Sequence, residues 1–258
     1  MKIIVSIVCS LLIALAVSPI IHPEGKTTDK VQACSKPSQE IISPTFRYDL
    51  STRAKHTVTK EQINKATTVA DLMPDYAIQK GLKDRILAVR DVKVITEDEK
   101  ETSASGRYAL TDEQLKILKS FDYSTNFFLE GYSIQNELIP DVNKERYFKY
   151  FMTVVPEKQA VYKEGKEALI EYLKSSAQAI IDKQEQGSLK SGNILLTISP
   201  SGILDKVELS RTCGYTSVDN RMLELFNQLP KGWWEAAANE KGENVEQTLI
   251  FTFGLLGC

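Results

Sequence analysis

The sequence predicts an α+β protein in three parts. These are an N-terminal apolar helix, a small α+β middle domain, and a C-terminal domain with two helices and a three-stranded antiparallel or mixed sheet. An uncharged apolar run opens the chain, capping and strand signals alternate in the middle, and the C-terminal part follows the order helix–strand–strand–helix–strand. We expect the apolar segment at 1–21, a linker at 22–45, and domains at 46–158 and 159–258.

The overall composition is that of an ordinary globular protein. Hydrophobic residues make up 42% of the 258 residues and charged residues 26%. The formal net charge is −2, whereas a protein that binds nucleic acid concentrates positive charge. We therefore expect no nucleic-acid partner.

The chain opens with a run that has no charged residue from Ile3 to Ile21. A run of about 18 apolar residues is long enough to span a bilayer. Ala14-Leu15-Ala16 also fits the small-x-small cleavage pattern of a signal peptide. An uncleaved anchor, a cleaved signal and a lipoprotein through Cys34 stay open, although Cys34 lies far from the apolar run. Each interpretation places the rest of the chain outside the cytoplasm.

Residues 22–45 are polar and interrupted by prolines, which is typical of a linker. In the middle domain, alternation around residues 92–96 predicts a strand, and Thr111 with Gln114 predicts a capping box at the start of a helix. Residues 124–134 and 147–155 are rich in aromatic and β-branched residues, so we expect two further strands.

The C-terminal part has clearer periodicity. Residues 164–181 and 216–229 place apolar residues on one helical face. Residues 194–198 and 203–209 flank the turn Pro200-Ser201-Gly202 and predict a hairpin. A last strand is expected over residues 245–253.

These segments together resemble the TonB C-terminal domain family from Tyr162 to Cys258. The resemblance rests on "YKEGKEALIEYLK", the hairpin "GNILLTISPSGILDKVELSR", the helix "SVDNRMLELFNQLP", Trp233-Trp234, and "VEQTLIFTFG". It implies a sheet with the first hairpin strand in the middle and the last strand at an edge. In the family, that edge strand binds a short segment of an outer-membrane receptor.

The resemblance implies a periplasm-facing protein that binds TonB-dependent outer-membrane receptors by strand addition, because an edge strand presents unpaired backbone groups. It would be held in the inner membrane by a single pass, or be soluble in the periplasm after signal cleavage, and inner-membrane proton-driven motor proteins are possible further partners. The expected partner-binding residues are Val245, Glu246, Gln247, Thr248, Leu249, Ile250, Phe251, Thr252, Phe253 and Trp234.

The implied strand order also bears on the cysteines. If the second and third strands flank the first, they run in the same direction, so Cys213 and Cys258 lie at the same end of the sheet. A Cys213–Cys258 disulfide follows, with two free buried thiols as the alternative. Cys34 is then left unpaired or pairs between chains.

The sequence also departs from the family. It has only nine prolines and no long Pro-rich spacer, and its apolar run shows no His or Ser pattern for coupling to a motor. The alternative is therefore a non-transducing envelope protein, binding or structural, that reuses a TonB-like domain.

We expect no enzyme activity, cofactor or metal site. His22 and His56 have no Cys, Asp or Glu partner at metal-ligand spacing, and no catalytic or phosphate-binding motif is present. Of the two tryptophans, one is expected in the core and the other at the surface as a contact residue.

Overall fold

A computed structural model of the chain describes residues 46–72, 86–96, 104–106, 109–135, 145–184 and 189–255. Contacts divide the chain into Met1–Ile42 and Ser43–Cys258. The predicted apolar helix at 1–21 and the linker at 22–45 lie outside the described residues. Within the described part, no helix is long and apolar enough to cross a bilayer.

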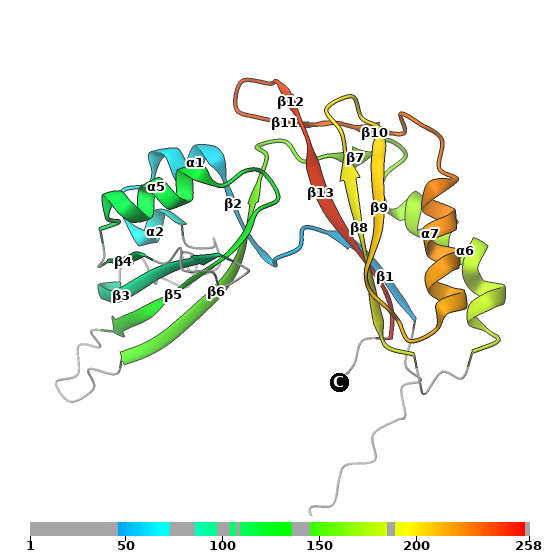
Figure 1. The fold of residues 1–258 in the computed structure, drawn as a ribbon, viewed down its shortest axis with the longest axis horizontal. Helices are drawn as coiled ribbons and strands as arrows, with labels where there is room; N and C mark the ends of the chain where they lie inside the picture. Colours follow the sequence, from blue (N-terminus) through cyan, green and yellow to red (C-terminus); the bar gives the residue numbers. More distant parts are fainter. Residues whose placement is uncertain are drawn as a thin grey trace, which may run out of the picture. The chain divides into compact units, whose positions relative to one another are not determined.

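The middle sheet, as we call it, has five strands in the order β2-β6-β5-β3-β4 (Figure 1). β2 is parallel to β6, and the other neighbours are antiparallel. The strands are β2 (His56–Thr59), β3 (Ile86–Thr96), β4 (Ala104–Gly106), β5 (Asn126–Gln135) and β6 (Glu145–Val155), and the helices are α1 (Lys60–Lys65), α2 (Val69–Leu72) and α5 (Asp112–Ser120).

The predicted capping box at the start of α5 is confirmed. Thr111 accepts a hydrogen bond from the backbone of Gln114, and the Gln114 side chain accepts one from the backbone of Thr111. The amide of Gln114 also donates to the backbone oxygen of Val92 at 2.8 Å. Gln114 is fully buried. Its side chain both caps the start of the helix and joins the helix to β3.

The C-terminal sheet, our name for the second large sheet, has four strands in the order β1-β13-β8-β9, all antiparallel. Helices α6 and α7 pack against each other and cover one of its faces (Figure 1). The elements are β1 (Arg47–Ser51), α6 (Lys166–Ile181), β8 (Ser191–Ile198), β9 (Leu204–Arg211), α7 (Thr216–Asn227) and β13 (Gln247–Gly254). Two short ladders complete it: β7 (Val161–Tyr162) with β10 (Trp234–Glu235), and β11 (Ala237–Ala238) with β12 (Asn244–Val245).

The expected order of helix, strand, strand, helix and strand is present as α6, β8, β9, α7 and β13. The first hairpin strand, β8, lies in the interior of the sheet, as the resemblance implied. Along β8, Ile194, Leu196 and Ile198 alternate and are all fully buried on the helix-covered face.

The predicted α+β fold class is wrong. The chain is mostly sheet, with 41% strand and 29% helix in several sheets, and no apolar membrane-type helix is present in the described part. The predicted three-stranded C-terminal sheet has a fourth strand, because residues 47–51 leave the middle domain and pair with β13. Pairing between segments so distant in sequence has no local signal, and this is why the prediction missed it.

The two sheets share part of their topology. In each, a helical segment precedes a hairpin, a second helix follows, and the next strand pairs antiparallel with the first hairpin strand: β3, β4, α5 and β5 in one case, β8, β9, α7 and β13 in the other. Each sheet then adds one more antiparallel strand beside the last of these. That strand is β6 in the middle sheet and β1 in the C-terminal sheet.

Cys213 follows β9, is fully buried, and forms no disulfide within the part of the chain that the structure describes. Its backbone N–H donates to Oδ1 of buried Asp219 at 3.0 Å. Burial raises the pKa of the Cys213 thiol to about 12, and the neighbouring Asp219 adds to the rise. Cys258 lies outside the described residues, so the Cys213–Cys258 disulfide stays a prediction.

The raised pKa predicts an unreactive thiol. Because the thiolate is the nucleophile, Cys213 in the reduced, folded protein is expected to resist iodoacetamide at pH 8 and to react only after unfolding. Peptide mapping by mass spectrometry measures this, with Cys213→Ser as the control. Rapid labelling of the folded protein would contradict the burial, and a Cys213 thiol that labels in denaturant only after reduction would show that Cys213 is in a disulfide.

Candidate partner-binding edge of the C-terminal sheet

The strand expected to bind a partner is β13, and its two faces differ. Leu249, Phe251 and Phe253 are buried against the helices, as the alternation predicted. Ile250 and Thr252 are half-buried on the opposite face. The strand pairs with β8 from Gln247↔Ile198 to Gly254↔Ser191. One edge of β13 is therefore fixed within the fold, and partner binding depends on its other edge.

That other edge is occupied by the chain itself. β1 pairs antiparallel with β13 from Arg47↔Gly254 to Ser51↔Ile250. The expectation of an exposed edge strand is therefore not met over Ile250–Gly254. Apolar contacts hold β1 at this edge, because Tyr48 and Leu50 lie opposite Phe253 and Phe251 and pack against the same core.

β1 forms a strand because apolar and polar residues alternate along it. Phe46, Tyr48 and Leu50 are half-buried, while the residues between them are exposed. The rings of Phe46 and Tyr48 are 4.9 Å apart, and those of Tyr48 and Phe251 are 6.1 Å apart. These contacts anchor the strand on its core face.

The hydroxyl of Tyr48 lacks a partner. It is buried and makes no hydrogen bond, and burial raises the pKa of Tyr48. A buried polar group without a partner costs about 1–3 kcal/mol. β1 is therefore held in place less well than its apolar contacts alone suggest.

One ion pair joins β1 to the helix layer. Nζ of Lys166, in the first turn of α6, contacts Oδ1 of Asp49. Both side chains are about half exposed, at 42% and 54%, so solvent screens the pair and it contributes little to stability. The pair nevertheless favours an acidic side chain at this position of the added strand.

The remaining predicted site residues precede the part of β13 that β1 covers. Val245 lies in β12 opposite Ala237, and Glu246 is exposed. Gln247 is buried and accepts a hydrogen bond from the backbone of Ala160 at 2.7 Å. The backbone N–H of Thr248 donates to Oγ of Ser124 at 2.8 Å. Gln247 and Thr248 are therefore tied into the fold, whereas exposed Glu246, together with Thr248, lines a second open hollow.

Trp234, expected to contact a partner, is a core residue. It is 2% exposed, and its ring lies edge-on to Tyr162 at 5.5 Å. Trp233 is the more exposed of the pair, yet it also packs on Tyr162, at 5.7 Å. Sequence predicted one buried and one surface tryptophan, but it had no basis for choosing between neighbours.

Glycine is required where β13 ends. Gly254 has φ +109°, and a Cβ there would lie 2.1 Å from the carbonyl oxygen of Lys190. Gly192, opposite Phe253, leaves room for its ring, because a Cβ would lie 2.7 Å from the ring edge. These two positions let β13 approach β8 closely at the end where β1 begins its pairing.

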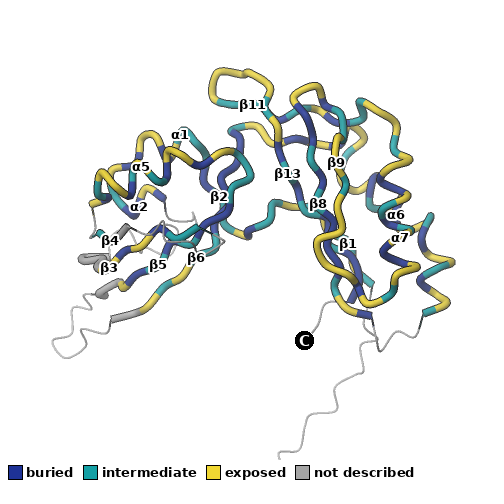
Figure 2. The backbone as a smooth tube through the Cα atoms, viewed as in Figure 1, coloured by how far each residue is buried: buried dark blue, intermediate teal, exposed yellow. Residues whose placement is uncertain are grey.

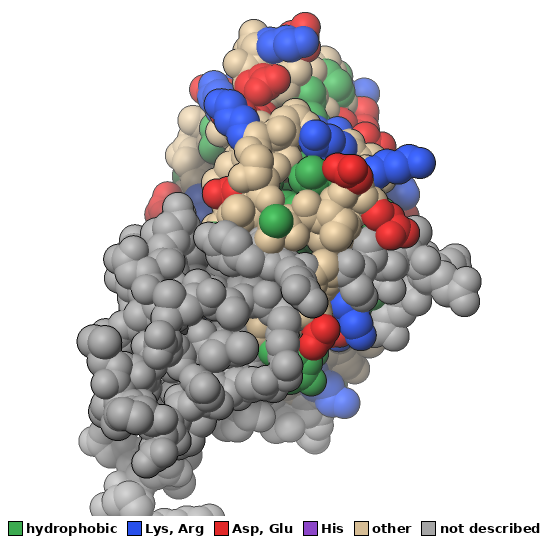
Figure 3. All heavy atoms as spheres, turned by 90° about the vertical axis from the view of Figure 1, so that its left-hand side faces the viewer, with side chains coloured by type: hydrophobic (Ala, Val, Ile, Leu, Met, Phe, Trp, Pro, Cys, Tyr) green, Lys and Arg blue, Asp and Glu red, His purple; other side chains and the backbone are tan. Residues whose placement is uncertain are grey.

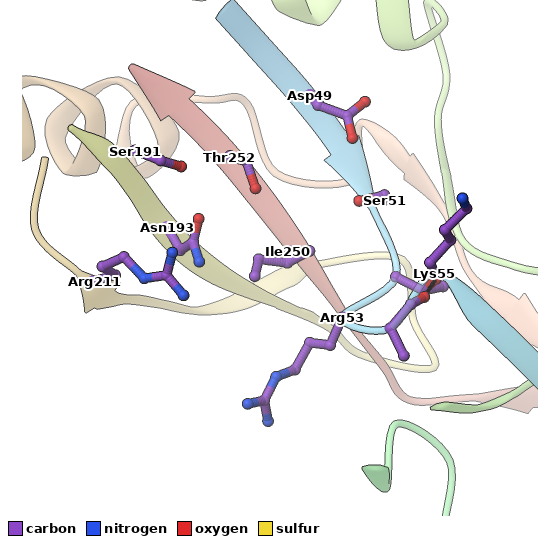
Figure 4. A pocket seen from close by; sticks show the side chains of 11 residues that line it. Asp49, Ser51, Arg53, Lys55, Ser191, Asn193, Arg211, Ile250 and Thr252 are labelled. Atoms are coloured by element: carbon purple, nitrogen blue, oxygen red, sulfur yellow. Dashed lines mark hydrogen bonds between the residues drawn. The ribbon is translucent and has the colours of Figure 1, made fainter. Parts of the chain in front are cut away.

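An open polar hollow lies on the sheet face away from the helices (Figure 4). It has a volume of about 500 Å³. Asn193 and Arg211 extend from neighbouring strands at one end, and Asp49 and Ser51 line it from β1. Oδ1 of Asn193 is buried without a hydrogen-bond partner. β1 thus forms one wall of the hollow as well as the sheet edge.

The opposite edge of the sheet is β9, which is mostly exposed (Figure 2). It carries alternating charges, including Lys206 and Glu208, whose side chains form an ion pair at 2.9 Å. Charged side chains on an edge strand oppose pairing with another chain. β9 is therefore less suited than β13 to accept an added strand.

The described residues hold no group of three His, Cys, Asp or Glu side chains placed to bind a metal. His56 is half-buried, and its ring lies edge-on to Tyr150 at 5.5 Å. Burial, and next the charge of Lys55, lower the pKa of His56. On the coloured surface in Figure 3, basic and acidic side chains are interspersed.

The strand Arg47–Ser51, which covers the outer edge of β13, was not among the predicted elements. Its alternation was a usable signal, because Phe46, Tyr48 and Leu50 follow period two directly after the linker. A run of five residues is short, however, and its partner strand lies at the other end of the chain.

Removal of the Tyr48 hydroxyl is expected to stabilise the protein. Tyr48→Phe keeps the ring contacts and deletes the unpaired buried group, so the free energy of unfolding in urea should rise by about 1 kcal/mol. Leu50→Ala, which removes apolar contacts from the same face of β1, should lower it. A Tyr48→Phe protein that is clearly less stable than wild type would mean that the hydroxyl has a partner.

Comparisons of this chain with protein families, with curated proteins and with solved structures found no significant match.

Proposed function

We propose that this chain is a periplasm-facing, TonB-like protein that binds outer-membrane transport receptors by taking up an extended receptor segment as an added strand on β13. One observation supports this best. β13 already accepts an antiparallel strand from a remote part of the chain, β1, through backbone pairing and two apolar side chains. Strand addition of this kind gives affinity through the main chain and specificity through alternate side chains.

The geometry of β1 defines the segment that fits. Side chains opposite Phe253 and Phe251 face the core, so the added segment favours apolar residues at two positions that are separated by one residue. The residue between them lies opposite Thr252 and faces solvent. The proposed ligand is therefore an extended peptide of about five residues with this alternation.

A non-transducing envelope protein that uses the same edge is the second candidate. It is favoured by β1, because an edge that the chain fills itself is not permanently open to a receptor. The two candidates share the binding mode and differ in whether the chain also associates with inner-membrane motor proteins. Affinity purification of the full chain from native membranes, followed by detection of proton-driven motor proteins, separates them.

The backbone of Thr252 provides the test of strand addition. The N–H of Thr248 points away from β8, toward Ser124, and the N–H of Thr252 points the same way, since backbone groups alternate along a strand. Thr252→Pro therefore removes an N–H that faces the added strand and spares the pairing with β8, whereas Thr252→Ala keeps it.

Both substitutions are made in a full-length protein whose β1 is kept from docking by Tyr48→Asp and Leu50→Asp. The ligand is a fluorescent peptide from the periplasm-exposed N-terminal segment of a TonB-dependent receptor of the same bacterium. Thr252→Pro should weaken binding about three- to tenfold, the value of one hydrogen bond, and Thr252→Ala much less. Equal affinities, or no binding by either protein, would reject strand addition at β13.

A further inference from the structure

β1 differs from its counterpart in the middle sheet. There, β6 closes the edge of β5 over a long ladder, from Asn126↔Thr153 to Ile134↔Glu145, and it is the next strand along the chain. β1 pairs with β13 only from Arg47 to Ser51 and comes from the opposite end of the described chain. The equivalent edge is thus covered by a long strand, β6, in the middle sheet and by a short strand, β1, in the C-terminal sheet.

The packing of β1 also differs from that of the strand it covers. Leu249, Phe251 and Phe253 are at most 4% exposed. The apolar residues of β1, in contrast, are only half-buried, and the Tyr48 hydroxyl has no partner. If β1 leaves, β13 keeps its ladder with β8 and its contacts with the helices. Release of β1 therefore does not require the sheet to unfold.

We infer that β1 is an exchangeable internal ligand of the C-terminal sheet: it occupies the partner-binding edge of β13 and is replaced by a partner segment of the pattern apolar–acidic–apolar. This inference rests on the proposed function for the identity of the partner. The acidic position follows from Lys166, which contacts the carboxylate of Asp49 between the two apolar residues. A partner with a carboxylate there would take over this ion pair.

An internal ligand lowers the apparent affinity for any partner. The tether keeps β1 at a high effective concentration near β13. The apparent dissociation constant is then the intrinsic value divided by the fraction of molecules whose edge is open. Binding is thereby restricted to partners that match the pattern well, or to conditions that release β1.

The first experiment uses a fluorescent peptide of residues 46–53, Phe-Arg-Tyr-Asp-Leu-Ser-Thr-Arg, as the probe. Full-length protein with Tyr48→Asp and Leu50→Asp, whose own β1 carries charges on its core face, should bind this peptide at least roughly tenfold more tightly than wild type. Lys174→Asp is the matched control, since it lowers the net charge by the same two units at an exposed site on α6. It should bind like wild type. Fluorescence anisotropy measures all three affinities.

Equal binding to wild type and to the double variant would overturn the inference, because β1 would then not compete for the edge. So would a folded double variant that fails to bind the peptide. Circular dichroism verifies the fold of each protein before titration.

A double-mutant cycle tests the acidic position. In the protein with Tyr48→Asp and Leu50→Asp, a peptide carrying Asp49→Asn should bind about threefold more weakly than the unchanged peptide, which is the value of an exposed ion pair. The difference should vanish when the protein also carries Lys166→Ala. A difference that persists without Lys166 would remove Lys166 from the recognition of the partner.

Hydrogen exchange of the wild-type full chain tests exchangeability without any substitution. Amide protons of Arg47–Ser51 are expected to exchange through local opening, much faster than those of Ile194–Ile198 in β8. Equal protection of the two segments would mean that β1 leaves only on global unfolding, and this would overturn the inference even if the double variant did not fold. None of these measurements uses a receptor, so failure of receptor binding would reject the proposed function and leave the result for β1 intact.

Discussion

The ring of Phe251 is the contact on which the C-terminal sheet depends. It is fully buried and meets three elements at once: Phe226 of α7 at 4.9 Å, Phe253 of its own strand at 6.1 Å, and Tyr48 of β1 at 6.1 Å. The helix layer, the last strand and the first strand are therefore joined at one side chain. Because β13 also pairs with β8 along its whole length, the core stays connected whichever strand lies at its outer edge.

How much could be read from the sequence depended on how local each signal was. The capping box of Thr111 and Gln114 lies within four residues, and the hairpin of β8 and β9 surrounds its own turn, so both were predictable. The position of β1 was not, since nothing near Arg47 indicates a partner at Gly254. The identity of the buried tryptophan was equally hidden, because Trp233 and Trp234 are neighbours and the ladder with β7 decides which one turns inward.

The candidate site was therefore half predictable. The strand, its core face and its outward face followed from alternation, and Leu249, Phe251 and Phe253 lie where the pattern placed them. The state of the edge did not follow. Pattern alone says that a strand has an edge, but only the three-dimensional arrangement says whether another segment already fills it. Gln247 and Thr248 show the same limit, because the groups that bind them, Ala160 and Ser124, belong to distant segments.

The antiparallel sense of β1 has a mechanical consequence. A pull on the chain ahead of Phe46 reaches β1 first, at the pair Arg47↔Gly254, and the pairs behind it follow toward Ser51↔Ile250. A load directed away from the sheet edge concentrates on that first pair and separates the residue pairs one after another. A load directed along the strand is shared by all the residue pairs at once and meets a far higher resistance. The same strand is thus weak in one direction of tension and strong in the other.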